Sequence, residues 1–221
     1  MQTTARLGRS MLCLMLAFTL LPLAAEAAKG KKKKKGGGGN PFAQAVALYN
    51  DGKYEDAIPL FQRVAQDQAD DPQVYFYLGM SHKRLDQYAP AISNLERAAS
   101  LDSEDFNSRK EAGSYQFDRR DYAAARRNLD QASQVRSDDQ QVEYQRGASA
   151  YLLGDYGGAR APLEHAVQLD SSHAYSHFFL GMTYYQQRDF GRAKEQLSIF
   201  VQQAPEAPEA VQARQVLQSL R

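Results

Sequence analysis

The sequence predicts an all-α fold built from similar helix pairs, because four columns of residues recur every 34 positions without an insertion or deletion. An aromatic residue marks the start of the second helix of each pair, a small residue follows three positions later, and a Leu or Phe follows four positions after that. The first helix carries a small residue nine positions before the aromatic one. The columns are Tyr54, Tyr88, Tyr122, Tyr156 and Phe190; Ala57, Ala91, Ala125, Ala159 and Ala193; Phe61, Leu95, Leu129, Leu163 and Leu197; and Ala45, Gly79, Gly113, Gly147 and Gly181.

The two small-residue columns explain why the helices pair. Gly or Ala lets two helix axes approach closely where they cross, and a larger side chain there costs about 1–3 kcal/mol in overpacking strain. The aromatic residue covers this crossing, and the Leu or Phe one turn later lies on the same buried stripe. A helix of about 14 residues is unstable alone in water, so neighbouring pairs must supply the core by stacking.

The period divides residues 40–207 into five units, and one more helix follows them. Asn40 is a good N-cap and Pro41 a good first helical residue, so the first helix is expected to begin there. Two Pro-Glu pairs begin a helix over residues 205–221. We expect this helix to cap the end of the stack and to present a polar face to solvent. The units are 38–71, 72–105, 106–139, 140–173 and 174–207.

The N-terminal region predicts export. Residues 1–27 combine two arginines, an apolar run over 11–21 and a small-residue site ending at Ala27. We therefore expect a signal peptide that is cleaved after Ala27, with Ala25 as a nearby alternative. The alternative is a signal retained as an anchor, although the run is shorter than the roughly 20 apolar residues of a spanning helix. The protein would then be periplasmic or secreted, and its single cysteine, Cys13, would leave with the signal.

Residues 28–39 are rich in Lys and Gly and predict a disordered linker that buries no core. The lysine run either tethers the protein to an anionic envelope surface, at about 1 kcal/mol per lysine near a charged membrane, or is a solvated spacer. The tether lysines are Lys31, Lys32, Lys33, Lys34 and Lys35. Residues 1–39 hold eight of the 27 basic and one of the 26 acidic residues, so residues 40–221 hold 19 and 25, a net charge of −6. This acidic body argues against a nucleic acid partner.

The four columns resemble the tetratricopeptide repeat (TPR) family, most clearly in the second unit with its Leu78-Gly79, Tyr88 and Ala91-Ile92. The resemblance covers residues 38–207. It implies a right-handed superhelical solenoid of five repeats plus the capping helix, with a concave face that is lined by the first helices and receives a peptide or helix of another protein.

Projecting the family's groove positions onto the first helices selects the expected binding residues. They are Phe42, Val46, Tyr49, Phe76, Met80, Lys83, Phe117, Tyr144, Tyr151, Phe178, Met182 and Tyr185. This groove is aromatic and Met-rich at its ends and more polar in the middle, where Lys110 and Ser114 share the columns. Rigid rings and adaptable Met favour an apolar or amphipathic ligand, although the same rings can simply pack between adjacent helices. Phe42 and Val46 replace the Lys and Asn of the family's carboxylate clamp, so that ligand mode is disfavoured.

Units three and four depart from the family pattern. Arg109 and Gln116 in one, and Glu143 and Arg146 in the other, stand where large packing residues are usual. We therefore expect loose packing of these first helices and the weakest local stability in the middle. A basic cluster in unit three either docks an acidic partner or is a solvated face paired with Glu111, Asp118 and Asp121. The cluster is Arg109, Lys110, Arg119, Arg120, Arg126 and Arg127.

Nothing in the sequence indicates catalysis. His173 and His177 are four residues apart, but no further His or Cys ligand accompanies them, so a surface pair is favoured over a zinc site. We expect no cofactor, no metal and no small-molecule substrate. The first hypothesis is therefore a non-enzymatic scaffold that binds another protein in the cell envelope. The second is a self-associating structural spacer tethered by the lysine run, and a metal-dependent enzyme ranks third.

Overall fold

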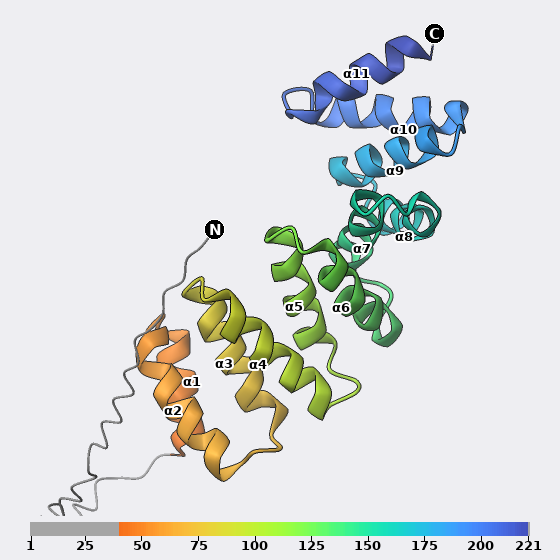
Figure 1. Cartoon of the computed structure of the whole chain (residues 1–221). Helices are drawn as coiled ribbons and strands as arrows, with labels where there is room; N and C mark the ends of the chain where they lie inside the picture. Colours follow the sequence, from red (N-terminus) through yellow and green to blue (C-terminus); the bar gives the residue numbers. More distant parts are fainter. Residues whose placement is uncertain (1–39, 221) are drawn as a thin grey trace, which may run out of the picture. The chain divides into compact units, whose positions relative to one another are not determined.

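The computed structural model describes residues 40–220, and this part of the chain is entirely helical apart from its turns (Figure 1). It contains no strand, so the all-α prediction is confirmed for these residues. The helices are α1 Pro41–Asn50, α2 Tyr54–Asp67, α3 Pro72–Arg84, α4 Tyr88–Leu101, α5 Phe106–Asp118, α6 Tyr122–Val135, α7 Gln140–Leu152, α8 Tyr156–Leu169, α9 Ala174–Gln186, α10 Phe190–Gln203 and α11 Glu209–Ser219. The expected signal peptide (1–27) and the linker (28–39) with its tether lysines lie outside the described residues.

Helices pack in consecutive pairs that stack on one another, as the 34-residue period predicts. Each odd-numbered helix from α1 to α9 contacts the even-numbered helix that follows it, and each even-numbered helix contacts the next odd one. The odd helices also touch one another, α1 with α3, α5 with α7, and α7 with α9, so they share one side of the stack. Helix α11 packs on α10. Residues 40–220 therefore form a solenoid of five helix pairs and a terminal helix.

The first helix of each pair begins at a capped residue. Asn40 Oδ1 accepts a hydrogen bond from Phe42 N at 3.0 Å, with Pro41 as the first helical residue, as predicted. The corresponding caps of α3, α5 and α7 are the carboxylates of Asp71, Asp105 and Asp139. Such caps satisfy backbone N–H groups that the helix itself leaves unpaired.

The turn within each pair has one left-handed residue. Gly52 and Gly154 have φ of +76° and +80°, and Asp86, Arg120 and Arg188 have φ of +57°, +63° and +62°. These five positions are 34 residues apart, and the next residue always donates its N–H to a carbonyl five positions earlier, at 2.9 Å in each turn. This is the Schellman arrangement, whose left-handed position favours Gly.

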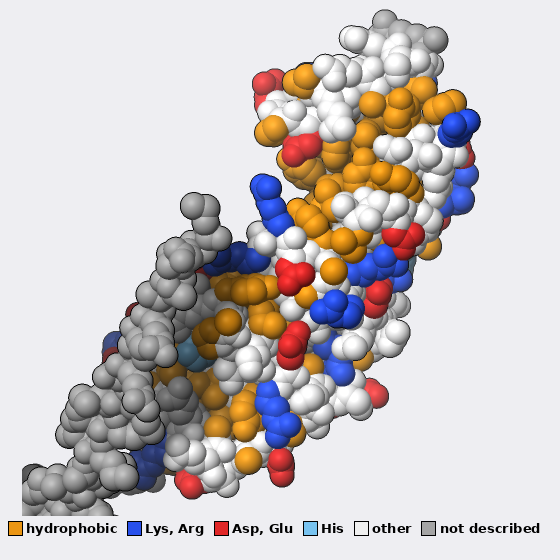
Figure 2. All heavy atoms as spheres, in the orientation of Figure 1, with side chains coloured by type: hydrophobic (Ala, Val, Ile, Leu, Met, Phe, Trp, Pro, Cys, Tyr) orange, Lys and Arg blue, Asp and Glu red, His pale blue; other side chains and the backbone are white. Residues whose placement is uncertain are grey.

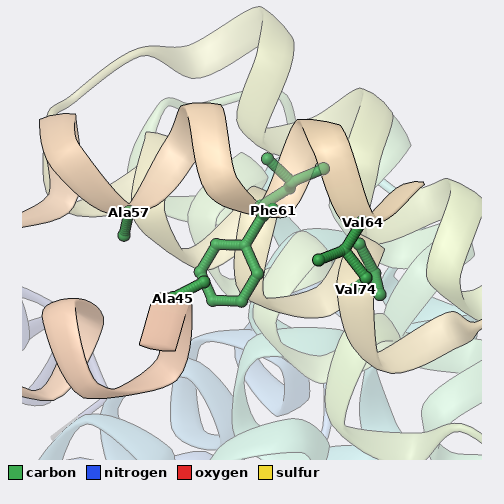
Figure 3. Packing of buried hydrophobic residues seen from close by; sticks show 6 residues of the cluster. Ala45, Ala57, Phe61, Val64 and Val74 are labelled. Carbon is green, nitrogen blue, oxygen red and sulfur yellow. The ribbon is translucent and has the colours of Figure 1, made fainter. Parts of the chain in front are cut away.

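The two helices of each pair cross closely, as the columns of Gly and Ala predict. A Cβ added at Gly147 would lie 2.5 Å from Leu163 Cγ, and Gly79, Gly113 and Gly181 are equally tight against their own Leu partners. In the first pair, Ala45 stands in the Gly column and packs against the ring of Phe61 beside Ala57 (Figure 3). All three of these side chains are fully buried.

The middle of the stack is not loosely packed, so that expectation was wrong. Gln116 and Glu143 are only 2% and 1% exposed. Glu143 accepts hydrogen bonds from Arg146 at 2.8 Å and from Ser133 at 2.5 Å, and Asn128 donates to Gln116 at 2.8 Å. Gln116 and Glu143 are thus buried together with hydrogen-bonding partners, which removes most of the cost of burying them.

Candidate partner-binding surface

The predicted groove residues lie on the odd-numbered helices, and we call this side of the stack the inner surface. Most of them are half-buried, so part of each side chain is open to solvent. These residues are Phe42, Val46, Tyr49, Phe76, Lys83, Phe117, Tyr144, Tyr151 and Tyr185. Because neighbouring side chains hold these rings in place, a partner can pack on their exposed part at little cost in conformational entropy.

Three predicted groove residues belong to the core instead. Phe178 and Met182 are 5% and 3% exposed and pack with Phe200 and with residues of α11. Met80, at 8% exposure, packs with Leu95 and Ala112. The terminal helix covers the first two and the neighbouring pair covers the third, so these side chains are not open for binding.

Four rings at the start of the stack form the N-terminal aromatic patch, defined as Phe42, Tyr49, Phe76 and Tyr77. The ring of Tyr77 lies 5.8 Å from that of Phe42, 5.3 Å from that of Tyr49 and 5.6 Å from that of Phe76, each in an edge-to-face arrangement. Tyr77 therefore connects the patch, although it lies outside the three predicted columns. Edge-to-face pairs add to the stability that burial gives each ring.

A second set, the C-terminal aromatic patch, consists of Phe117, Tyr144, Tyr151 and Phe179. Ring centroids are 6.1 Å apart for Phe117 and Tyr144, 6.0 Å for Tyr144 and Phe179, and 5.5 Å for Tyr151 and Phe179. Burial and nearby negative charge raise the pKa of Tyr144 far above its usual range. Phe179 was missed from the sequence, although its half-buried position beside the buried Phe178 follows from helical periodicity.

Between the patches, polar side chains of the inner surface are paired with one another. Lys83 Nζ lies 2.7 Å from Glu111 Oε2, and Lys110 Nζ lies 2.6 Å from Asp139 Oδ2. Burial opposes the ionisation of Asp139, but hydrogen bonds from Lys110 and from a backbone N–H hold its pKa below its usual value. The first pair joins α3 to α5 and the second joins α5 to the cap of α7, so the polar middle predicted from the sequence is already satisfied within the chain.

A shallow hollow of about 360 Å³ opens between α3 and α5, next to the N-terminal aromatic patch. Phe76 and Tyr77 form part of its wall, and Asp102, Asp105 and Asn107 contribute polar groups. Each carboxylate uses Oδ1 to accept a backbone N–H, from Glu104 in one case and from Ser108 in the other.

The basic cluster of the third repeat is paired, but with other acids than the sequence suggested. Arg119 binds Asp86, Arg126 lies 2.7 Å from Asp155, and Lys110 reaches Asp139. Arg109 donates to the backbone carbonyls of residues 99, 102 and 105. Asp86 and Asp155 belong to the adjacent repeats and Asp139 caps α7, so the partners are not the local acids Glu111, Asp118 and Asp121. Arg120 and Arg127 remain exposed.

His173 and His177 are occupied by other contacts. His173 caps α9, where its Nδ1 accepts from Ser176 N at 3.3 Å, and its ring lies 4.6 Å from that of Tyr144. His177 is buried, with Nδ1 2.7 Å from Gln196 Oε1 and Nε2 3.0 Å from a backbone carbonyl. Within residues 40–220, no cluster of three His, Cys, Asp or Glu side chains is placed to hold a metal ion. None of the described helices has both the length and the apolar character needed to cross a membrane.

The comparisons with known proteins agree with this geometry. The family model described as Tetratricopeptide repeat matches residues 42–106 and 110–174. No curated protein matches the chain. Among solved structures, YrrB, described as a TPR protein with an unusual peptide-binding site, is similar with a TM-score of 0.71 at 18% identity, over 79% of this chain and 90% of YrrB.

Two other similar structures are MamA of Desulfovibrio magneticus RS-1 and pilF of Pseudomonas aeruginosa. MamA has a TM-score of 0.64 at 17% identity, over 77% of this chain and 98% of MamA. For pilF the TM-score is 0.58 at 14% identity, over 81% of this chain and 86% of pilF. At these identities the likeness shows the fold alone.

Proposed function

Because the chain belongs to the tetratricopeptide repeat family, we propose that it is an exported, non-enzymatic scaffold that binds a peptide or helix of another protein on its inner surface. The family's fold is that of a protein–protein interaction scaffold, and a partner within a complex of the cell envelope is our proposal. The observation that carries it is the pair of half-exposed aromatic patches on the odd-numbered helices. YrrB, which shares the fold, is described as having a peptide-binding site.

Crosslinking in the native envelope followed by mass spectrometry tests this proposal directly. Crosslinks are expected from one discrete partner to the inner surface. Phe76→Ala combined with Tyr185→Ala should weaken capture of that partner, because both side chains are half-exposed rings. Leu169→Ala, at an exposed position on the even-numbered helix α8, is the control and should leave capture unchanged. Equal capture by all three proteins would refute binding on the inner surface.

Export is tested separately. The mass of the protein isolated from its native cells should correspond to a chain that begins at Ala28, with the protein in the periplasmic or secreted fraction. An intact N-terminus in the membrane fraction would support the retained-anchor alternative, and an intact N-terminus in the cytoplasmic fraction would refute export.

Self-association is a second candidate function, and exposed apolar side chains favour it. Leu152, Leu153 and Phe190 are 42%, 47% and 48% exposed at the turns within the fourth and fifth pairs. Exposed apolar groups of this kind can mark protein contacts. A monomeric mass by light scattering across the accessible concentration range would exclude this candidate.

A further inference from the structure

The C-terminal aromatic patch lies next to carboxylates. Asp118 follows Phe117 directly at the end of α5, and Glu209 Oε2 accepts a hydrogen bond from Tyr175 at 2.8 Å. The ring of Tyr175 lies 6.5 Å from that of Phe178, which lies 5.3 Å from that of Phe179, so Glu209 lies beside the patch. The pKa of Tyr144 is raised first by burial and then by nearby Tyr175, Glu209 and Asp118. Figure 2 shows hydrophobic side chains gathered over the C-terminal helices, with acidic side chains at their margin. Rings beside fixed negative charge are a favourable environment for a cation.

The carboxylate of Asp118 does not stabilise the fold at its position. It is the last residue of α5, where the helix dipole presents negative potential, so a carboxylate there is unfavourable. Within residues 40–220 it forms no hydrogen bond and no ion pair that would offset this cost, and it is exposed. A negative charge is thus held at the edge of an aromatic patch without a partner from the described part of the chain.

The same combination of rings and carboxylates occurs in the hollow between α3 and α5. Phe76 and Tyr77 line it together with Asp102 and Asp105, each of which uses only Oδ1 in its turn or cap. Lys83 and Lys110 do not neutralise these sites, because they are paired with Glu111 and Asp139, and Arg109 donates to backbone carbonyls of residues 99, 102 and 105. Residues 40–221 as a whole carry a net charge of −6.

We propose that the inner surface binds a basic amphipathic segment of another protein, whose apolar side chains pack on the aromatic patches while its Lys or Arg side chains bind the carboxylates of Asp118 and Glu209. This inference rests on the proposed function and names its ligand class. Charge complementarity of this kind determines which partner binds and how fast it associates. It also makes the affinity fall with salt, because exposed charges are screened over about 8–10 Å.

Two synthetic 14-residue amphipathic peptides test the proposal. They share the same apolar positions, and their polar positions are all Lys in one and all Glu in the other. Fluorescence anisotropy with the full chain should show the Lys peptide binding at least tenfold more tightly at about 0.05 M salt. Asp118→Asn with Glu209→Gln should weaken the Lys peptide by fivefold or more. The amide that replaces the Glu209 carboxylate retains an acceptor for the Tyr175 hydroxyl, so the circular dichroism melt should not change.

The control removes two carboxylates elsewhere. Glu55→Gln with Asp56→Asn makes the same change in net charge on the exposed first turn of α2, and it should leave peptide affinity within twofold. Equal weakening by both double variants, or tighter binding of the Glu peptide, would overturn the proposal. If neither peptide binds while Phe76→Ala with Tyr185→Ala still releases the native partner, the ligand class is wrong but the proposed function stands. A mass that grows with protein concentration while the peptides do not bind would assign the surface to a second copy.

Discussion

The closest contact of each helix crossing can be tested by adding one methyl group. Gly→Ala in a helix normally stabilises by about 1 kcal/mol. At Gly147, however, the new Cβ would lie 2.5 Å from Leu163 Cγ and 3.1 Å from the backbone oxygen of Ala159, well inside the 3.5–4.0 Å of favourable carbon contacts. Overpacking of this kind costs about 1–3 kcal/mol. We therefore expect Gly147→Ala to lower the free energy of unfolding by about 0–2 kcal/mol.

Gly157 provides a matched control on the next helix, α8. A Cβ there would meet only Asp155 Oδ1, at 3.7 Å, which is an ordinary contact. Gly157→Ala should therefore raise stability, and the two variants should differ by about 1–3 kcal/mol. Urea titrations followed by circular dichroism at 222 nm measure this difference, provided that the slopes agree. If Gly147→Ala stabilises as much as Gly157→Ala, the close crossing does not limit the fold.

The first repeat indicates how the strain can be relieved. There Ala45 replaces the Gly and Phe61 replaces the Leu, so a flat ring accepts the extra methyl (Figure 3). Gly147→Ala combined with Leu163→Phe should consequently be more stable than the sum of the two single changes predicts. A coupling energy of about 0.5–1 kcal/mol or more would show the compensation, and strict additivity would contradict it.

Three further predictions concern other parts of the stack. Burial holds the pKa of His173 below its ordinary 6.5. The unfolded state therefore binds more protons, and the free energy of unfolding falls as the pH drops below about 6.5. His173→Asp should remove this pH dependence from urea midpoints measured at about pH 5 and 7. Arg146→Met leaves the buried Glu143 without its main partner and should cost about 3–5 kcal/mol in the same titration. Arg188→Gly relieves a left-handed residue and should raise the melting temperature, gaining about 1 kcal/mol.

Much of the fold followed from the sequence because the crossing contacts depend on side-chain size. The close crossing requires Gly, Ala and Leu at fixed positions, and comparing the sequence with itself at a shift of 34 residues reveals these columns. The left-handed turn column escaped detection, since Gly52, Asp86, Arg120, Gly154 and Arg188 share a backbone conformation but no chemistry. The geometry of the Schellman turn requires this left-handed conformation, and several residue types adopt it at some energetic cost.

The binding surface was less predictable because exposure depends on what stacks next. Phe178 occupies the same column as the half-buried Phe76, yet α11 covers it. The prediction of ion pairs from the sequence was wrong for the same reason. Arg126 lies 2.7 Å from Asp155, about one repeat away, and 3.7 Å from Asp130, and it pairs with none of the acids that the sequence suggested. Contacts between repeats form at separations of about 30 residues, which local pattern matching does not examine.

The polar contacts of the inner side follow the stack from one repeat to the next. Lys83 joins α3 to α5, Lys110 joins α5 to the cap of α7, Gln140 in α7 donates to Ser176 in α9, and Tyr175 in α9 donates to Glu209 in α11. Each contact fixes the spacing of two neighbouring odd-numbered helices, and so the spacing of the rings that those helices carry. A partner therefore meets rings whose relative positions are already set by the chain, which lowers the entropic cost of binding. The same pairing leaves few charges free on the inner surface, so those that remain, Asp118 above all, have a larger share in selecting the partner.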